Sequence, residues 1–261
     1  MKIIVCIKQV PNTTEIKVDP VTKTLKRDGV PSIINPDDKT AVEVALQLKE
    51  KHGATVTVLT MGPAQAERAL REALAMGADE AFLLTDRAFA GSDTLATSTI
   101  LAAAIKKLGA DYVFCGRQAI DGDTAQVGPQ IAEHLGIPQI TYAEAVDYDE
   151  AKGALVVKRQ FEDRYQILEV CAPCLVTILS SLAKPRYMNA WDIVSQDEKE
   201  VGKITFADID VKAEDIGLNG SPTKVKSTAT KQFDKTTEMR ELSPDDAAKL
   251  IVETLKQRYL I

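Results

Sequence analysis

The chain has 261 residues, of which 45% are hydrophobic and 27% charged, the balance of a globular protein with a sizeable core. Its formal net charge of -6 provides no overall positive field, so nucleic acid and anionic membranes are not expected partners. No apolar run approaches the roughly 20 residues that span a bilayer, and the apolar start is too short for a secretory signal, so we expect no membrane insertion and a cytoplasmic location.

Short apolar, β-branched runs recur through the first half of the chain and predict buried parallel strands. These runs are 2–7, 55–59, 81–84 and 111–115. Amphipathic stretches between them predict helices at 40–51, 64–75 and 93–108. A glycine follows each stretch, where helices commonly end: Gly53, Gly77 and Gly109. The alternation predicts an α/β fold with a parallel twisted sheet covered by helices on both faces.

The pattern changes after Pro138, where two β-prone runs flank a turn-rich centre and ILEVCAPCLVTILSS follows. Antiparallel strands at the sheet edge are predicted there. From about Asp197 the chain becomes polar until a final amphipathic stretch at 243–259, which Ser243 and Pro244 can open as N-cap and first helical residue. We therefore expect an α/β domain at 1–196 and, at 197–261, an extended arm with a C-terminal helix that lies on another subunit.

Little in the chain resembles a self-sufficient catalytic site or metal centre. The two histidines, His52 and His134, lie near the ends of predicted helices, which leaves no material for a zinc site or a histidine-based triad. Cys171 and Cys174 have the CxxC spacing of redox-active cysteine pairs. Such pairs acquire a low pKa at the start of a helix, whereas these two cysteines lie between strand-like runs. A strand bent at Pro173 is the favoured interpretation, so neither catalytic residues nor metal ligands are expected.

The nucleotide-binding fingerprints GxGxxG and GxxxxGK[ST] are both absent, yet three other segments follow predicted strands and open helices. At such positions free N–H groups and the helix dipole favour anions. The segments are Asn35-Pro36-Asp37-Asp38, then Gly91-Ser92-Asp93-Thr94 with Thr97, and finally 115–128 (CGRQAIDGDTAQVG). Ordinary helix capping and turn formation remain the alternative for each segment alone.

The third segment carries the most information. Its glycines allow close backbone approach, and Arg117 can meet a phosphate. Groups for ligand hydroxyls and amides come from Asp121, Asp123, Thr124 and Gln126. One helix end contributes only about 0.3–1 kcal/mol to anion binding, so several loops must converge on one ligand. In an open α/β sheet they converge at the carboxyl ends of the strands.

Five segments resemble the β subunit of electron-transfer flavoproteins, in the same order and spacing from about residue 2 to 195. They are CIKQVPNT, NPDDKTAVEVALQLKEKHG, TMGPAQAERALREALAMGADEA, CGRQAIDGDTAQVGPQIAEHLGIPQ and LAKPRYMNA. The resemblance implies an adenine-nucleotide-hydrolase-like α/β fold and a heterodimer with an α subunit. That subunit holds flavin adenine dinucleotide (FAD) and exchanges electrons with an acyl-CoA dehydrogenase.

The resemblance also implies which residues bind the cofactor. The pocket would be lined by Cys6, Asn35, Pro36, Asp37, Asp38 and Met61. Its adenosine and phosphate would be wrapped by Gly116, Arg117, Gln118, Ala119, Ile120, Asp121, Gly122, Asp123, Thr124, Ala125, Gln126 and Val127. Ordinary family members hold AMP in this pocket. A second class bifurcates electrons: its β subunit holds a complete FAD that NADH reduces, and ferredoxin or flavodoxin receives one electron while the α-subunit FAD receives the other.

The loop AGSDTLAT resembles the second class. Ser92, Thr94 and Thr97 at a helix start, beside Asp93, can hold a second phosphate and so extend the site to a pyrophosphate. We therefore expect FAD and bifurcation, with structural AMP in a non-bifurcating subunit as the alternative. A stand-alone nucleotide sensor is a weaker alternative, because a compact monomer has no use for the arm.

The segment 186–201 resembles the family's recognition loop for the dehydrogenase. Its Tyr187, Met188 and Trp191 are residue types that anchor interfaces. The alternative is a helix that packs Trp191 into its own core, because tryptophan is often buried.

Overall fold

The computed structural model describes residues 1–12, 31–224 and 239–261. The apolar runs form a nine-stranded sheet in the order β11-β5-β4-β1-β6-β10-β7-β8-β9. From β11 to β7 each strand runs parallel to its neighbours, which confirms the predicted parallel sheet. The parallel strands are β1 (Lys2–Cys6), β4 (Thr55–Met61), β5 (Glu80–Leu84), β6 (Tyr112–Gly116), β7 (Gln139–Asp149), β10 (Cys174–Ile178) and β11 (Val201–Ile204). A separate two-stranded sheet pairs β2 (Gln9–Pro11) with β3 (Ser32–Ile34).

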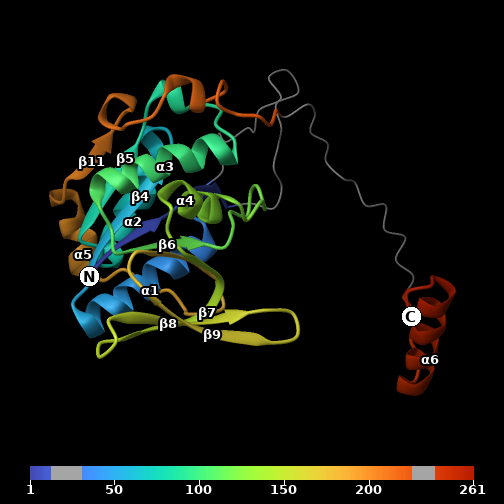
Figure 1. Cartoon of the computed structure of the whole chain (residues 1–261). Helices are drawn as coiled ribbons and strands as arrows, with labels where there is room; N and C mark the ends of the chain where they lie inside the picture. Colours follow the sequence, from blue (N-terminus) through green and yellow to red (C-terminus); the bar gives the residue numbers. More distant parts are fainter. Residues whose placement is uncertain (13–30, 225–238) are drawn as a thin grey trace. The chain divides into compact units, whose positions relative to one another are not determined.

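Helices cover both faces of the main sheet, as the sequence predicts (Figure 1). Helices α1 (Pro36–His52) and α2 (Glu67–Met76) pack with alternate strand residues such as Ile3 and Val5 into one apolar cluster. Helices α3 (Thr94–Leu108) and α4 (Val127–Leu135) pack with Ile4 and Leu175 on the other face. Adjacent residues of one strand therefore serve two cores, which is why the strand sequences are continuously apolar.

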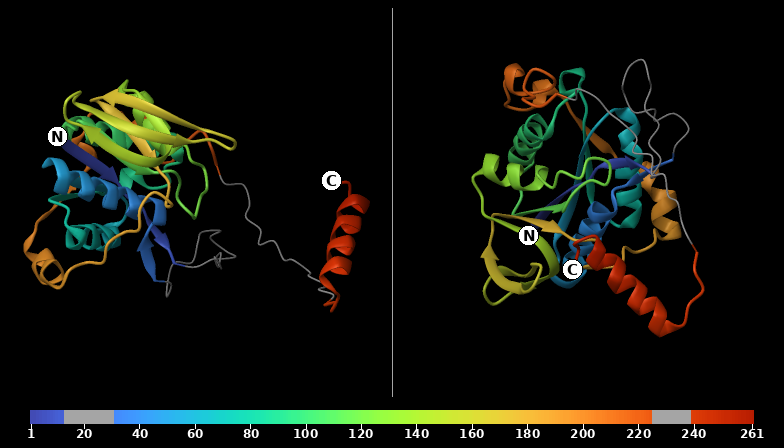
Figure 2. Two further views of the ribbon diagram at one scale, coloured as in Figure 1. Left: turned by 90° about the horizontal axis from the view of Figure 1, so that it is seen from below. Right: turned by 90° about the vertical axis from the view of Figure 1, so that its right-hand side faces the viewer.

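The antiparallel edge is confirmed for two strands and corrected for a third. Strands β8 (Ala154–Gln160) and β9 (Tyr165–Cys171) run antiparallel beyond β7 and are the yellow ribbons of Figure 2. Strand β10, by contrast, lies between β6 and β7 and is parallel to both. All five of its residues, Cys174–Ile178, are buried, as a strand inside a doubly covered sheet requires.

The region expected to be an arm begins as part of the sheet. Strand β11 pairs with β5, and the compact unit extends from Met1 to Lys226, beyond the boundary expected at 196. Three isolated apolar residues of this polar stretch are buried in the cluster beneath α3: Ile204, Ile209 and Ile216. Apolar side chains are buried in the core even where the surrounding sequence is polar. Residues 225–238, in the middle of the expected arm, lie outside the described residues.

The second unit, Ser227–Ile261, contains the predicted C-terminal helix as α6 (Pro244–Gln257). The hydroxyl of Ser243 accepts a hydrogen bond from the Asp246 N–H, and Pro244 opens the helix, as predicted. None of the α6 side chains is buried, and Ile251 and Val252 are exposed apolar residues. This helix has the amphipathic surface of an element that packs on another protein.

All four cysteines lie in the described part of the chain and are free thiols. Cys6, Cys115 and Cys174 are buried, whereas Cys171, the last residue of β9, is exposed. The CAPC segment therefore joins two strands that are not neighbours in the sheet, instead of forming one strand bent at Pro173, which corrects the bent-strand interpretation. Among the described residues, no helix combines the length and apolar character needed to cross a membrane.

A candidate nucleotide site

A cavity of about 420 Å³ opens where three adjacent strands, β4, β1 and β6, end. This volume lies within the range of roughly 300–1,000 Å³ that small-molecule pockets occupy. The cavity brings together most of the predicted site residues from all three segments. The predicted residues that line it are Cys6, Asp38, Met61, Ser92, Asp93, Thr94, Thr97, Gly116, Arg117, Gln118, Ala119, Gly122, Asp123, Thr124, Ala125, Gln126 and Val127.

Five predicted residues do not line the cavity: Asn35, Pro36, Asp37, Ile120 and Asp121. Asn35 instead supports the loop between β6 and α4. Its buried amide donates to the Gln118 carbonyl oxygen at 2.8 Å and accepts from the Ile120 N–H at 3.0 Å. The Asp121 carboxylate lies 2.6 Å from the Lys8 ammonium and so ties the same loop to the end of β1.

Asp38, in the first turn of α1, joins two strand ends through one carboxylate. Its Oδ2 accepts from the Lys8 N–H at 2.7 Å, and its Oδ1 accepts from the Gly116 N–H at 3.0 Å. Burial raises the pKa of Asp38 to about 7, against the lowering effect of these hydrogen bonds. A side chain at position 116 would collide with this carboxylate, because a Cβ there would lie 2.2 Å from Asp38 Oδ1. The glycine thus permits the close packing of β6 on α1.

The neighbouring Asp37 faces Arg117 instead of the cavity. Its Oδ2 lies 3.5 Å from Arg117 Nε, and its Oδ1 accepts from the Ser180 N–H at 3.2 Å. Arg117 lines the cavity, and its ion pair with the Asp37 carboxylate holds the start of the loop that follows β6. A guanidinium in this position can still offer its remaining N–H groups to a phosphate.

The start of α3 forms the opposite wall. Asp93 is the N-cap: its Oδ1 accepts from the N–H groups of Leu95 and Ala96. Because these N–H groups are occupied, the capping interpretation applies to Asp93. The hydroxyls of Thr94 and Thr97 line this wall. The Thr94 hydroxyl donates its hydrogen to Gln126 Oε1 at 3.0 Å, so it becomes a donor to a ligand when it exchanges that hydrogen bond.

The loop between β6 and α4 has two non-glycine residues in the left-handed region, Asp123 at φ 49° and Ala125 at φ 52°. Both line the cavity. Such conformations are uncommon for these residue types and concentrate at ligand-binding segments. Left-handed residues in such a loop can turn successive backbone N–H groups toward one side, as anion-binding loops do.

Two thiols form part of the floor. Cys6 and Cys115 are register partners on β1 and β6, and both line the cavity. A hydrogen bond with Cys6, together with burial, raises the pKa of Cys115 well above its usual value. Cys115 is therefore a neutral thiol and not a nucleophile.

The site residues implied by the resemblance leave out five lining residues: Ile7, Lys8, Leu101, Cys115 and Gly128. Of these, Cys115 and Gly128 are the two ends of the candidate segment 115–128. Lys8 had a usable signal, since it lies two residues beyond the end of β1 at the carboxyl edge, where ligands bind in such sheets. Leu101 had none, because an apolar residue on α3 is equally expected in the core.

Comparisons with known proteins find a matching family model and relatives that span the whole chain. Residues 22–211 match the family model described as "Electron transfer flavoprotein domain". The chain is 56% identical to the electron transfer flavoprotein subunit beta of Clostridium acetobutylicum, over the full length of both chains. It is 48% identical to the caffeyl-CoA reductase-Etf complex subunit CarD of Acetobacterium woodii, and 46% identical to the acryloyl-CoA reductase electron transfer subunit gamma of Anaerotignum propionicum, again over the full length of each.

Proposed function

Because the chain belongs to the electron transfer flavoprotein family as a β subunit, we propose that it is the NADH-oxidising, bifurcating kind, which binds FAD in the cavity beside β1 and β6. It would pass electrons to ferredoxin or flavodoxin and, through the FAD of an α subunit, to an acyl-CoA dehydrogenase in the cytoplasm. Two relatives whose printed names place them with CoA-ester reductases support this reading.

The observation that carries the proposal is the meeting of two loops in one cavity. The loop Gly116–Val127 and the α3 start with Thr94 and Thr97 face a common space. A mononucleotide needs one phosphate site, whereas a dinucleotide needs room and donors for two phosphates. Arg117 and the N–H groups around Asp123 and Ala125 suit one phosphate, and the two threonine hydroxyls suit the second.

The residues present fit FAD by their chemistry. The floor of Cys6, Cys115 and Met61 is apolar, while the rim carries Lys8 and Arg117 against a negatively charged ligand. When bound, FAD supplies the chemistry of accepting a hydride and releasing electrons singly. This chain's own residues bind it, orient it and shield it from water.

The alternative is a non-bifurcating β subunit with structural AMP. The cavity of about 420 Å³ also suits a mononucleotide, and Asp93 places a carboxylate at the wall where the second phosphate would lie. The two functions differ in one countable property, because the bifurcating heterodimer carries two flavins and the other carries one flavin and one AMP.

The test changes Thr94 and Thr97 together to valine in the heterodimer. Each lost hydroxyl bond to a phosphate costs about 1–3 kcal/mol, so FAD affinity at the β site falls tenfold or more. Flavin per heterodimer should drop from two toward one, and NADH-dependent ferredoxin reduction should fall in proportion. The half-buried Thr99, which lies on α3 but does not line the cavity, provides the control, since Thr99→Val should keep both flavins. A wild-type heterodimer that carries one flavin plus AMP would refute the proposal.

We propose a separate binding surface on this chain for each of two protein partners, the α subunit and the dehydrogenase. The helix α6 with its exposed Ile251 and Val252 is proposed to pack on the α subunit. The dehydrogenase is proposed to dock on Tyr187, Met188 and Trp191, named here the docking surface. Tyr187 is 90% exposed and Trp191 is 79% exposed, which argues against the alternative that Trp191 fills this chain's own core.

A further inference from the structure

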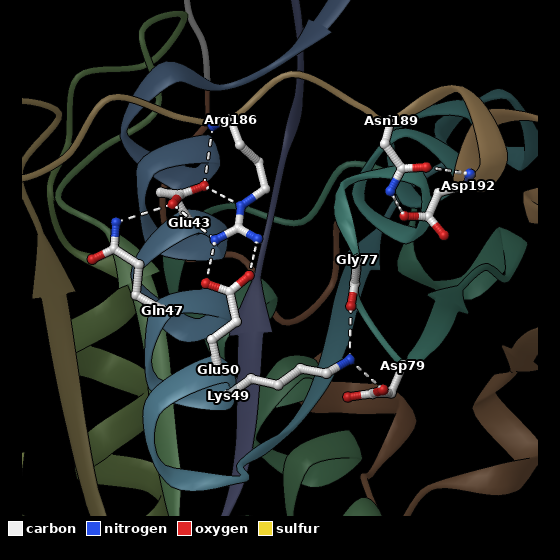
Figure 3. Close-up of polar contacts among 9 residues, drawn as sticks. All are labelled: Glu43, Gln47, Lys49, Glu50, Gly77, Asp79, Arg186, Asn189 and Asp192. Atoms are coloured by element: carbon white, nitrogen blue, oxygen red, sulfur yellow. Dashed lines mark hydrogen bonds and ion pairs between the residues drawn. The ribbon is translucent and has the colours of Figure 1, made fainter.

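The segment that carries the docking surface is bound to α1 at two levels. After β10, the Ser180 N–H donates to Asp37 in the first turn of α1. Farther along, Arg186 lies across the side of α1 between Glu43 and Glu50, as Figure 3 shows. The segment therefore follows the helix from the cavity end toward its other end.

Arg186 forms an unusually complete set of contacts, which we name the Arg186 clamp. Its N–H and its Nε both donate to Glu43 Oε2, at 3.0 and 2.8 Å, and Nη2 donates to Glu43 Oε1 at 3.1 Å. The guanidinium also pairs with both Glu50 oxygens. Main chain and side chain are thus held by the same carboxylate, which restricts the backbone at position 186 as well as the side chain.

Burial distinguishes the two carboxylates of the clamp. Glu43 is only 5% exposed; burial alone would raise its pKa, but hydrogen bonds from Arg186 and Gln47 leave the pKa lowered. The side chain of Glu50 is 60% exposed, and Arg186 lowers its pKa mainly through their hydrogen bond. A buried, hydrogen-bonded ion pair resists rearrangement more than an exposed pair, so Glu43 holds the position and Glu50 adds orientation.

The docking surface begins at the very next residue. Tyr187 follows Arg186 directly, and Trp191 lies in the short helix α5 (Ala190–Ser195). Asn189 caps that helix, since its Oδ1 accepts from the Asp192 N–H at 2.7 Å (Figure 3). Exposed aromatic side chains on a loop would sample many orientations without such restraints.

We propose that Arg186 is a positioning residue that holds the docking surface in its binding-competent arrangement on α1, the helix whose first turn forms part of the nucleotide cavity. The proposal rests on the function proposed above, because it assumes that an acyl-CoA dehydrogenase binds Tyr187, Met188 and Trp191. Arg186 itself touches neither cofactor nor partner. Its loss lowers the fraction of molecules whose surface is ready to bind, and apparent affinity falls by that fraction.

The experiment measures steady-state reduction of a purified acyl-CoA dehydrogenase by the wild-type and variant heterodimers, with NADH as donor. Arg186→Gln alone leaves a buried carboxylate unpaired, so Arg186→Gln/Glu43→Gln is made beside it, and Glu50→Gln weakens the clamp from its exposed side. The double variant should raise KM for the dehydrogenase about tenfold and change kcat less than twofold. NADH-dependent reduction of a small tetrazolium dye, which needs no docking, should stay at the wild-type rate.

Lys49→Gln is the matched control. Lys49 lies on the same helix and makes a similar pair of contacts, with Asp79 at 2.5 Å and with the Gly77 carbonyl at 2.9 Å, but it holds no part of the docking segment (Figure 3). It should leave KM unchanged. Arg186→Lys should recover part of the lost affinity, since lysine keeps the charge without the planar fork.

Trp191→Ala separates the two proposals. A raised KM in Trp191→Ala with an unchanged KM in the clamp variants would overturn the role of Arg186. An unchanged KM in Trp191→Ala would instead overturn the docking surface. Equal loss of dye reduction and dehydrogenase reduction in the clamp variants would show a general structural role, which also contradicts the proposal.

Discussion

A single buried carboxylate, Asp38, connects the ends of β1 and β6 beneath the cavity. Few side chains could do this, since the position needs two acceptor atoms that diverge toward two backbone N–H groups. Asp37 stands beside it and its charge raises the pKa of Asp38 further. The residue is therefore a local source of pH dependence inside an otherwise apolar floor.

The first prediction concerns that pH dependence. The pKa of Asp38 is about 7 in the folded chain, whereas its ordinary value is 3.8, so between these values the folded state binds more protons than the unfolded state. The free energy of unfolding should therefore decrease as pH rises from 4 to 7, by at most about 1.4 kcal/mol per pH unit from this group, and then level off.

Urea unfolding of wild type and Asp38→Asn at several pH values measures this contribution. The variant lacks the titrating proton, so the difference between the two unfolding free energies should change across pH 4–7 and be constant above it. Asp93 and Glu43, whose pKa values are lowered in the fold, are present in both proteins, so their contributions cancel in the difference. A difference that stays constant from pH 4 to 8 would contradict the assigned pKa.

At the same scale, residue types in the sequence predicted most of the cavity lining but not which side chains face inward. Asp121 was expected to meet the ligand, yet it pairs with Lys8, a residue 113 positions away in the chain. Asn35 was expected in the pocket, yet it braces the loop that forms it. Local sequence indicates that a segment lies at the site, whereas the direction of each side chain depends on contacts between distant segments.

At the scale of elements, β11 shows how a short strand joins a distant part of the chain to the core. It contributes the buried Ile204, and Ile209 and Ile216 follow on the same side of the sheet. These residues seal the face that α3 covers. Strand β5 is thereby paired on both sides, and the short strand β11 forms the edge of the sheet.

The second prediction follows from this burial. Ile204→Ala removes a side chain that is 3% exposed and should lower the free energy of unfolding by about 2–5 kcal/mol. Lys203→Ala, on the exposed position beside it in β11, should change it by less than about 0.5 kcal/mol. Chemical denaturation provides both values, and equal effects of the two variants would show that β11 does not belong to the core.

The strands and helices of the first half were predictable because each is long and strongly patterned. Strand β11 was not, since its four residues carry a glycine and a lysine and the surrounding sequence is polar. The position of β10 in the sheet was also not predictable, because the order of strands along the sequence does not determine which strands become neighbours in the sheet. Its uninterrupted apolar character, CLVTI, was nevertheless a sign of a central parallel strand.

At the scale of the whole molecule, the chain consists of a unit at Met1–Lys226 and a second unit at Ser227–Ile261. The first unit holds the cavity and the docking surface. The second unit has no buried helix residue of its own, so its helix gains little from folding alone.

The third prediction is that truncation after Lys226 separates folding from assembly. The truncated chain should keep the unfolding midpoint of the first unit, because no core residue is removed, but should no longer co-purify with the α subunit. Truncation after Val201 provides the contrast, since it removes Ile204, Ile209 and Ile216 and should prevent folding. If the chain ending at Lys226 still co-purifies at full yield, α6 does not hold the α subunit.

The distribution of free thiols allows the molecule to be labelled at a single site. Cys171 is exposed at the end of β9, while the other three cysteines are buried, two of them in the cavity floor. A maleimide dye should therefore react first at Cys171, without any engineered cysteine. One fluorophore at that position, paired with a second on a redox partner, can report encounters between the two proteins as they occur.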